Sequence, residues 1–330
     1  MPTVMFTPEA LVRVKGPWVE MLQAAGFHVD YPEDSTFTRG LCGQAETIRV
    51  LRDADALIAG AEFLTAEVLD ALPKLRVIAR AGVGYDRVDV AAATKHRIPL
   101  TITPTANHEA VAETVFALMF AIAKSVIDND ARVRSGKWRK GPTQPIRGLT
   151  LGLFGLGRIG RSTAIRARAM GMHVIATETN PDQAFVKQHA VELVDFETLL
   201  ARSDYLSVHC PLNAETRGMF NRDVFYKMRP GSVFINTARG ELVHEADLVE
   251  ALANHLHAAG LDVFAEEPPS PDNPLFKCEN LVASPHLGGA DTLAQRNMAI
   301  EAADCIIKLS RNEWPTGAVV NNELQVGWKW

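Results

Sequence analysis

Short apolar runs alternate with helix-like segments along most of the chain. In the first hundred residues, the runs that predict strands are TVMF (3–6), FHVDY (27–31), ALIA (56–59), RVIA (76–79) and IPLTIT (98–103). Segments whose apolar residues fit a helical period lie between them, at residues 18–25, 45–52, 65–71 and 88–95. Strands that alternate with helices are typical of a parallel sheet covered by helices on both faces.

A second alternating series begins near Leu149. Its predicted strands are LTLGLF (149–154), HVIAT (173–177), YLSVH (205–209), SVFIN (232–236), AAGLDV (258–263) and NLVAS (280–284). Helical patterns fit residues 158–170, 196–202, 222–228 and 246–254, and a further helix is expected at 293–309. Between the two series, residues 111–123 are almost wholly apolar but too short to cross a bilayer, so they predict a buried helix.

Length and composition agree with two α/β domains. A chain of 330 residues corresponds to about two domains, and 47% apolar with 22% charged residues is ordinary globular composition. The net charge of −5 predicts neither a nucleic-acid nor a membrane partner. The four cysteines are scattered without metal or redox spacing, and the N-terminus lacks a signal-peptide pattern. We therefore expect a cytoplasmic protein without a metal site.

A glycine-rich turn follows the first strand of the second series. Gly155, Gly157 and Gly160 form a GxGxxG pattern directly after an apolar strand and at the start of a helix. These spacings permit a tight turn, let backbone N–H groups approach a pyrophosphate, and allow close packing of helix on strand. Glu178 ends the next predicted strand, where a carboxylate accepts hydrogen bonds from ribose hydroxyls and repels a 2′-phosphate. The pattern predicts a dinucleotide site that prefers NAD.

Polar residues follow the remaining strands of the second series. They lie in the segments 209–212, 236–240, 262–268 and 284–289, and they include Arg239, Glu267 and His286. Because ligands of open α/β sheets bind beyond the carboxyl ends of the strands, these side chains are expected on one rim. An arginine can hold a carboxylate through two parallel hydrogen bonds, and a histidine paired with a glutamate can carry a proton reversibly. Hydride transfer to a 2-oxo acid requires both groups.

The chain resembles the D-isomer-specific 2-hydroxyacid dehydrogenases, and within them the phosphoglycerate dehydrogenase-like branch. The motifs that carry the resemblance are RAGVGYDRVD (80–89), NHEAVAE (107–113), GLGRIG (155–160), HCPLNAETRGMF (209–220), NTARGELV (236–243), GLDVFAEEP (260–268) and SPHLGG (284–289). The resemblance implies two Rossmann-like, doubly wound domains. A discontinuous, flavodoxin-like substrate domain is expected at 1–104 and 290–330, and an NAD-binding Rossmann domain at 105–289. It also implies a homodimer built around the nucleotide domain, an interface that the apolar helix from Val111 would suit, with burial within one subunit as the alternative.

The resemblance also assigns roles to residues. Arg239 would bind the substrate carboxylate and carbonyl, His286 would be the acid/base, and Glu267 would support it, with Glu266 as the competing acid. Backbone groups of Val83 and Gly84 would contact the substrate carboxylate. We expect the cofactor to contact Gly155, Gly157, Arg158, Ile159, Gly160, Glu178, His209, Cys210, Pro211, Thr237, Asp262, Gly288 and Gly289.

The loop after the third strand departs from the phosphoglycerate dehydrogenase pattern. In those enzymes it usually contains an arginine that meets the substrate phosphate, whereas here it reads IAGAEFLT (58–65) with Glu62. A carboxylate repels phosphate, so a small, unphosphorylated 2-oxo acid is expected unless Arg80 or another base compensates. One alternative is a glyoxylate or hydroxypyruvate reductase that uses NADPH. An alternative of another class is an NAD-gated scaffold resembling the C-terminal-binding-protein corepressors, which turnover of NADH with 2-oxo acids would exclude.

Overall fold

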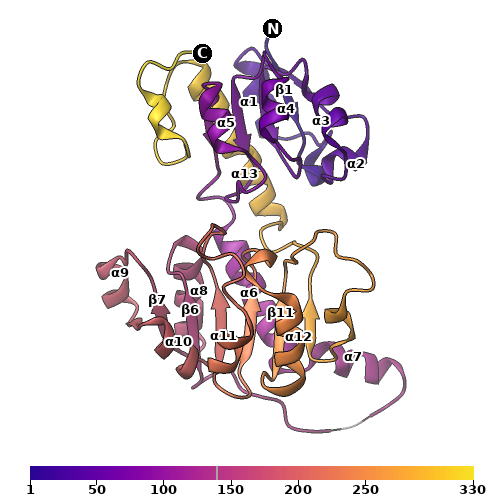
Figure 1. Ribbon diagram of the computed structural model, residues 1–330, viewed down its shortest axis with the longest axis vertical. Helices are drawn as coiled ribbons and strands as arrows, with labels where there is room; N and C mark the ends of the chain where they lie inside the picture. Colours follow the sequence, from indigo (N-terminus) through magenta and orange to yellow (C-terminus); the bar gives the residue numbers. More distant parts are fainter. Residues whose placement is uncertain (139) are drawn as a thin grey trace. The chain divides into compact units, whose positions relative to one another are not determined.

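The computed structural model describes residues 1–138 and 140–330. The chain divides into two compact units, the first made of Met1–Asn107 with Ala290–Trp330 and the second of His108–Gly289 (Figure 1). Each unit contains one wholly parallel sheet with helices on both faces. The predicted α/β class with two doubly wound sheets is therefore confirmed.

The first unit contains a five-stranded sheet in the order β2-β1-β3-β4-β5, which is the flavodoxin-like order. All five strands expected from the sequence form: β1 Thr3–Phe6, β2 His28–Asp30, β3 Ala56–Ala59, β4 Val77–Arg80 and β5 Leu100–Thr101. Side chains alternate along a strand, and β3 shows the result. Ala56 and Ile58 pack into one apolar cluster with α13, whereas Leu57 and Ala59 pack into the cluster on the other face.

Helices of two sizes cover this sheet. The long C-terminal helix α13 (Thr292–Ser310) packs against β3, β4 and α1, so this late segment completes the core of the first unit. The remaining helices are α1 Pro17–Ala24, α2 Ser35–Thr38, α3 Gln44–Leu51, α4 Ala66–Asp70 and α5 Val90–Lys95, with 3₁₀ turns at Glu9–Leu11 and Asn322–Gln325. The apolar spacing predicts α1, α3, α4, α5 and α13 to within a few residues.

The second unit contains a seven-stranded parallel sheet in the order β12-β11-β10-β9-β6-β7-β8. The strands are β6 Thr150–Phe154, β7 His173–Thr177, β8 Glu192–Leu193, β9 Tyr205–Val208, β10 Val233–Asn236, β11 Ala258–Leu261 and β12 Leu281–Ala283. Six of them are predicted from the sequence, and β8 is not, because a two-residue edge strand gives no periodic signal. The chain order reverses on either side of β6, which makes the carboxyl end of β6 the switch point where ligands of such sheets bind.

The helices of the second unit include the expected buried one. That helix, α6 (His108–Ala123), is largely buried and packs against α8 and against β10, β11 and β12 (Figure 1). The apolar residues of this helix from Val111 onward are therefore buried within their own unit. This is the alternative that the sequence analysis gave to a role in a dimer interface. The others are α7 Val126–Arg134, α8 Arg158–Ala169, α9 Gln183–Gln188, α10 Phe196–Arg202, α11 Arg222–Lys227 and α12 Glu245–Asn254, with 3₁₀ turns at Gly240–Leu242 and Pro274–Lys277.

No single helix in the described part of the chain has the length and apolar composition to cross a membrane. By length and composition alone, α6 and α7 pass that test only when taken together, and they are bent by 56° relative to each other.

Candidate active site

The glycine-rich turn lies at the switch point of the second sheet, between β6 and α8. Gly155 has φ of +104°, a conformation that other residues rarely adopt. A Cβ on Gly160 would lie 2.3 Å from the carbonyl oxygen of Gly155, so only glycine lets the helix pack this closely. A Cβ on Gly157, by contrast, would meet nothing within 4 Å among the described residues. The turn is therefore closely packed at Gly155 and Gly160 and open at Gly157, beside the N-terminus of α8. A bound pyrophosphate requires such an opening.

Two of the predicted nucleotide contacts lie in the first turn of α8. Arg158 is the first residue of the helix and is exposed, and Ile159 follows it half-buried. The first turn of α8 contains no acidic residue, so the unpaired N–H groups there have no carboxylate of their own turn beside them. This arrangement favours a bound anion.

Glu178 follows the last residue of β7 and is fixed against the glycine-rich turn. Its Oε2 accepts a hydrogen bond from the backbone N–H of Leu156 at 2.7 Å, and its Oε1 accepts one from that of Asn180 at 3.1 Å. Partial burial acts to raise the pKa of Glu178, but these backbone hydrogen bonds outweigh it and hold the pKa below its ordinary value. An ionised carboxylate therefore stands beside the turn at neutral pH.

The residues after β9 and β10 form the neighbouring part of the rim. The backbone carbonyl of His209 would lie 2.9 Å from a Cβ on Gly155, so this strand end packs directly against the glycine-rich turn. Burial lowers the pKa of His209 to about 4, and burial raises the pKa of Cys210 to about 11, so both are uncharged at neutral pH. Pro211 is exposed. The buried hydroxyl of Thr237 has no hydrogen-bond partner within the described residues, as expected of a group that meets a ligand.

The loop carrying Arg239 begins at Asn236, the last residue of β10. The Asn236 side chain donates to the Arg239 carbonyl at 2.7 Å and accepts from the Ala238 N–H at 3.0 Å, which closes the loop on itself. Gly240 then packs on the loop after β11, since a Cβ there would lie 1.9 Å from the Phe264 carbonyl carbon. This contact keeps the Arg239 loop next to the segment that leads to Glu267.

His286 and Glu267 form a direct pair. The His286 Nδ1 lies 2.7 Å from the Glu267 Oε2, and the Glu267 Oε1 accepts a hydrogen bond from the Phe264 N–H at 3.2 Å. His286 has φ of +56°, in the left-handed region that residues with a side chain rarely adopt, and such conformations are typical of functional sites. Its ring is held at Nδ1, which leaves Nε2 as the atom that can exchange a proton with a substrate.

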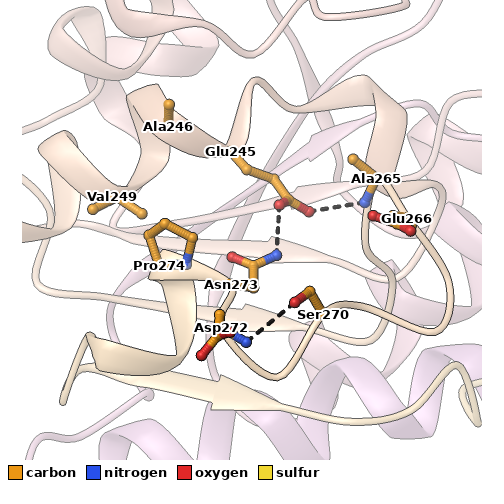
Figure 2. Close-up of a pocket in the computed structure, with 9 residues that line it drawn as sticks. All are labelled: Glu245, Ala246, Val249, Ala265, Glu266, Ser270, Asp272, Asn273 and Pro274. Atoms are coloured by element: carbon orange, nitrogen blue, oxygen red, sulfur yellow. Dashed lines mark hydrogen bonds between the residues drawn. The ribbon is translucent and has the colours of Figure 1, made fainter.

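Glu266, the competing acid, lies elsewhere. It lines a separate cavity of about 490 Å³ together with Glu245, Ala265 and Asn273. Figure 2 shows the Glu245 carboxylate between two loops, where it accepts a hydrogen bond from the Ala265 N–H and one from the Asn273 side chain, both at 2.8 Å. Glu245 thus braces the segment that leads to Glu267. Sequence reasoning missed this residue because nothing in its own helix reveals contacts with two other loops.

The remaining predicted residues are placed as follows. Asp262, at the end of β11, is 1% exposed, and its carboxylate accepts hydrogen bonds from the turn that carries His286. Gly288 is buried in that turn, and Gly289 ends the second unit. Val83 and Gly84 belong to the first unit, in the loop after β4, where the Gly82 N–H donates to the Thr103 hydroxyl at 2.9 Å.

Taken within the second unit, these contacts define a dinucleotide-binding α/β protein with an arginine loop and a His–Glu pair at the carboxyl ends of its strands. Residues 116–288 match the family model described as D-isomer specific 2-hydroxyacid dehydrogenase, NAD binding domain. The chain belongs to the D-isomer specific 2-hydroxyacid dehydrogenase family, and the matched segment is its NAD-binding domain. The family and the cofactor expected from the sequence are thereby confirmed.

Similar proteins come from several organisms. The chain is 39% identical to the D-3-phosphoglycerate dehydrogenase of Mycobacterium leprae over 85% of this chain and 55% of that one. It is also 39% identical to the glyoxylate reductase of Korarchaeum cryptofilum, over 84% of this chain and 86% of that one. The crystal structure of the TT0316 protein from Thermus thermophilus superposes with a TM-score of 0.85 at 34% identity, covering 96% and 99% of the two chains. The chain spans about half the length of the phosphoglycerate dehydrogenases it matches.

Proposed function

We propose that the protein is an NAD-dependent dehydrogenase that interconverts a small 2-oxo acid and the corresponding D-2-hydroxy acid. The observation that carries this proposal is the His286–Glu267 pair. The His286 Nδ1 lies 2.7 Å from the Glu267 Oε2, and both residues lie in loops that follow strands of the sheet that also carries the glycine-rich turn. The Arg239 loop reaches the same rim through the contact of Gly240 with Phe264. The residues proposed to bind the nucleotide, the substrate carboxylate and the proton thus follow strands of one sheet.

Each of these residues has a defined task in the proposed reaction. Arg239 holds the substrate carboxylate and polarises the adjacent carbonyl. When bound at the glycine-rich turn and beside Glu178, NADH would supply the hydride that reduces the carbonyl carbon. Protonated His286 gives its Nε2 proton to the carbonyl oxygen, so the product is the hydroxy acid and neutral histidine. Glu267 stabilises the charged imidazolium before the transfer, and oxidation runs the same steps in reverse.

The fixed carboxylate of Glu178 is proposed to select NAD(H) over NADP(H). Glu178→Arg should shift the ratio of catalytic efficiencies toward NADP(H) by about 10- to 100-fold, because a repulsive charge becomes an attractive one. Glu178→Gln is the matched control, since it removes the charge but keeps an acceptor for Leu156, and it should give a smaller shift. The ratio is measured with both cofactors at one substrate concentration. Equal efficiency of the unchanged protein with both cofactors would contradict this role.

The first unit supports an unphosphorylated substrate. Glu62 lies in the loop after β3 and is 4% exposed; its carboxyl group accepts hydrogen bonds from the Thr7 hydroxyl at 2.7 Å and the Gly60 N–H at 3.0 Å. Burial raises the pKa of Glu62, while the Thr7 hydrogen bond and the charge of Arg80 act in the opposite direction. The same loop, residues 58–65, contains no lysine or arginine. The loop itself therefore supplies no cation for a second anionic group on the substrate. Arg80 and Arg87, which donate hydrogen bonds to the Ala59 and Ala61 carbonyls of this loop, are the cations that could compensate.

A panel of 2-oxo acids tests the proposed function and its substrate class. With NADH, glyoxylate, pyruvate or hydroxypyruvate should be reduced at least as efficiently as phosphohydroxypyruvate, because the loop offers no base for phosphate. The measurement is kcat/KM from NADH absorbance for each acid. A clear preference for the phosphorylated acid would overturn the substrate class, and no turnover of any acid would overturn the enzyme assignment.

We further propose a cytoplasmic homodimer. Three apolar residues of α7, Val126, Ile127 and Val133, are more than half exposed, and Trp138 is 79% exposed. Apolar residues gathered in this way on one helix and the segment after it are typical of a subunit interface. All four cysteines are free thiols, which fits a reducing compartment. Sedimentation should give the mass of a dimer, and Ile127→Asp should shift it toward that of the single chain.

A further inference from the structure

Asp262 lies at the end of β11, and the turn carrying His286 is built around it. One carboxylate oxygen accepts hydrogen bonds from the Ser284 hydroxyl at 2.6 Å and the Leu287 N–H at 3.0 Å. The other accepts from the Gly288 N–H at 2.7 Å. The backbone carbonyl of Asp262 accepts from the His286 N–H at 2.8 Å. Four hydrogen bonds from residues 284–288 thus converge on a single residue.

The turn needs this support because its backbone is not intrinsically favourable. His286 has φ of +56°, which is disfavoured for a residue with a Cβ and persists only where surrounding contacts hold it. The turn also needs a glycine at position 288, because a Cβ there would lie only 2.7 Å from the Asp262 Oδ2. The Gly288 carbonyl also accepts a hydrogen bond from the Thr114 hydroxyl of α6 at 3.2 Å, which ties the end of the turn to the buried helix.

His286 is therefore held at two points. Asp262 fixes its backbone through the N–H and the turn, and Glu267 fixes its ring through Nδ1 at 2.7 Å. Two fixed points determine where Nε2, the proton-donating atom, is placed. A displacement of such a donor by about 1 Å can lower the rate about a hundredfold, because proton transfer needs the reacting atoms near hydrogen-bond distance.

We propose that Asp262 is a positioning residue for the proton donor, which acts by holding the 284–288 turn in the conformation that presents His286. The inference rests on the proposed function. This role is separate from the cofactor contact expected from the sequence, and it is argued from the 1% exposure of Asp262 and from the hydrogen bonds that both of its oxygens accept from the turn. A direct cofactor ligand would mainly affect NADH affinity, whereas a positioning residue mainly affects kcat.

Asp262→Asn tests the proposal. An asparagine has one acceptor oxygen, so its NH₂ group would face a donor, either the Gly288 N–H or the Ser284 and Leu287 donors. We expect kcat for 2-oxo acid reduction to fall about 10- to 100-fold while NADH affinity, measured by fluorescence titration, is retained. The solvent deuterium isotope effect on kcat should rise, because proton donation from a displaced histidine becomes slower than the other steps.

Two further variants complete the experiment. Ser284→Ala removes one donor but keeps both backbone N–H groups, so it should lower kcat by a smaller factor, about two- to fivefold, with the same rise in the isotope effect. Asp272→Asn makes the same chemical change at an exposed residue of the cavity in Figure 2 and should leave kcat and the isotope effect unchanged. If Asp262→Asn does not fold, Ser284→Ala carries the test alone.

Several results would overturn the inference. These are unchanged kcat in the folded Asp262→Asn protein, a lower kcat without a change in the isotope effect, or weaker NADH binding with full kcat at saturation. Unchanged kcat and isotope effect in Ser284→Ala would also overturn it if that variant stands alone. Failure of the proposed function has a different signature, namely no turnover by the unchanged protein or full activity of His286→Ala.

Discussion

Replacement of His286 by alanine is expected to lower the rate of both reduction and oxidation by about 10²- to 10⁴-fold, which is the contribution of a positioned proton donor. The loss should persist at every pH from 6 to 9, because alanine can neither give nor take a proton. NADH affinity should be retained, since the glycine-rich turn and Glu178 are untouched. Steady-state rates with a 2-oxo acid and NADH, and with the D-hydroxy acid and NAD⁺, provide the measurement.

Glu267→Gln separates the role of the pair from that of the histidine alone. Glutamine keeps the size and a hydrogen bond to Nδ1, but it removes the negative charge 2.7 Å from the ring that stabilises the imidazolium. Reduction needs the protonated ring and oxidation the neutral one, so at neutral pH reduction should suffer more. Rates of reduction and oxidation, each compared with that of the unchanged protein at the same pH, provide the measurement. Glu266→Gln is the matched control, and an equal effect from it would contradict the pairing.

The fold could be predicted from the sequence wherever a periodic apolar pattern was long enough. Strand β6 (Thr150–Phe154) and the buried helix α6 are examples. An element that is buried on most sides consists of a nearly continuous apolar run, which surface segments do not show. The elements that were missed are short or poorly buried. The edge strand β8 has two residues, and α7 and α9 contain no buried residue, so burial imposes no regular apolar period on either helix.

The candidate site was predictable as a set of residue positions but not as a set of contacts. Arg239, Glu267 and His286 follow strands of one parallel sheet, so their place on a common rim follows from topology. The hydrogen bonds of Asp262, the brace from Glu245 and the close packing of Gly240 each join loops that are distant in sequence. Glu62 shows the same limit, since the sequence predicts a carboxylate that repels phosphate but not its burial against Thr7.

Arg239→Lys should raise the KM for the 2-oxo acid strongly and lower kcat by about 10²-fold or more. Lysine carries the same positive charge as arginine. Its ammonium group, however, cannot form the two parallel hydrogen bonds that a guanidinium makes with a carboxylate, nor polarise the carbonyl from the same position. The Arg239 Nη1 donates to the Ala238 carbonyl at 2.6 Å, so the guanidinium is also oriented by its own loop, and lysine loses that orientation.

A comparison of NADH affinity with kcat and KM for the 2-oxo acid identifies what Arg239 does. NADH affinity should barely change, because the loss concerns the substrate acid, and the deficit should therefore appear in kcat/KM for the acid alone. Arg222→Lys on α11 is the matched control, since Arg222 forms a surface ion pair with Glu250 at 2.8 Å and should be kinetically silent. Normal 2-oxo acid kinetics in Arg239→Lys would remove Arg239 from the site. A raised KM with full kcat would instead limit it to binding, because carbonyl polarisation contributes only in the transition state.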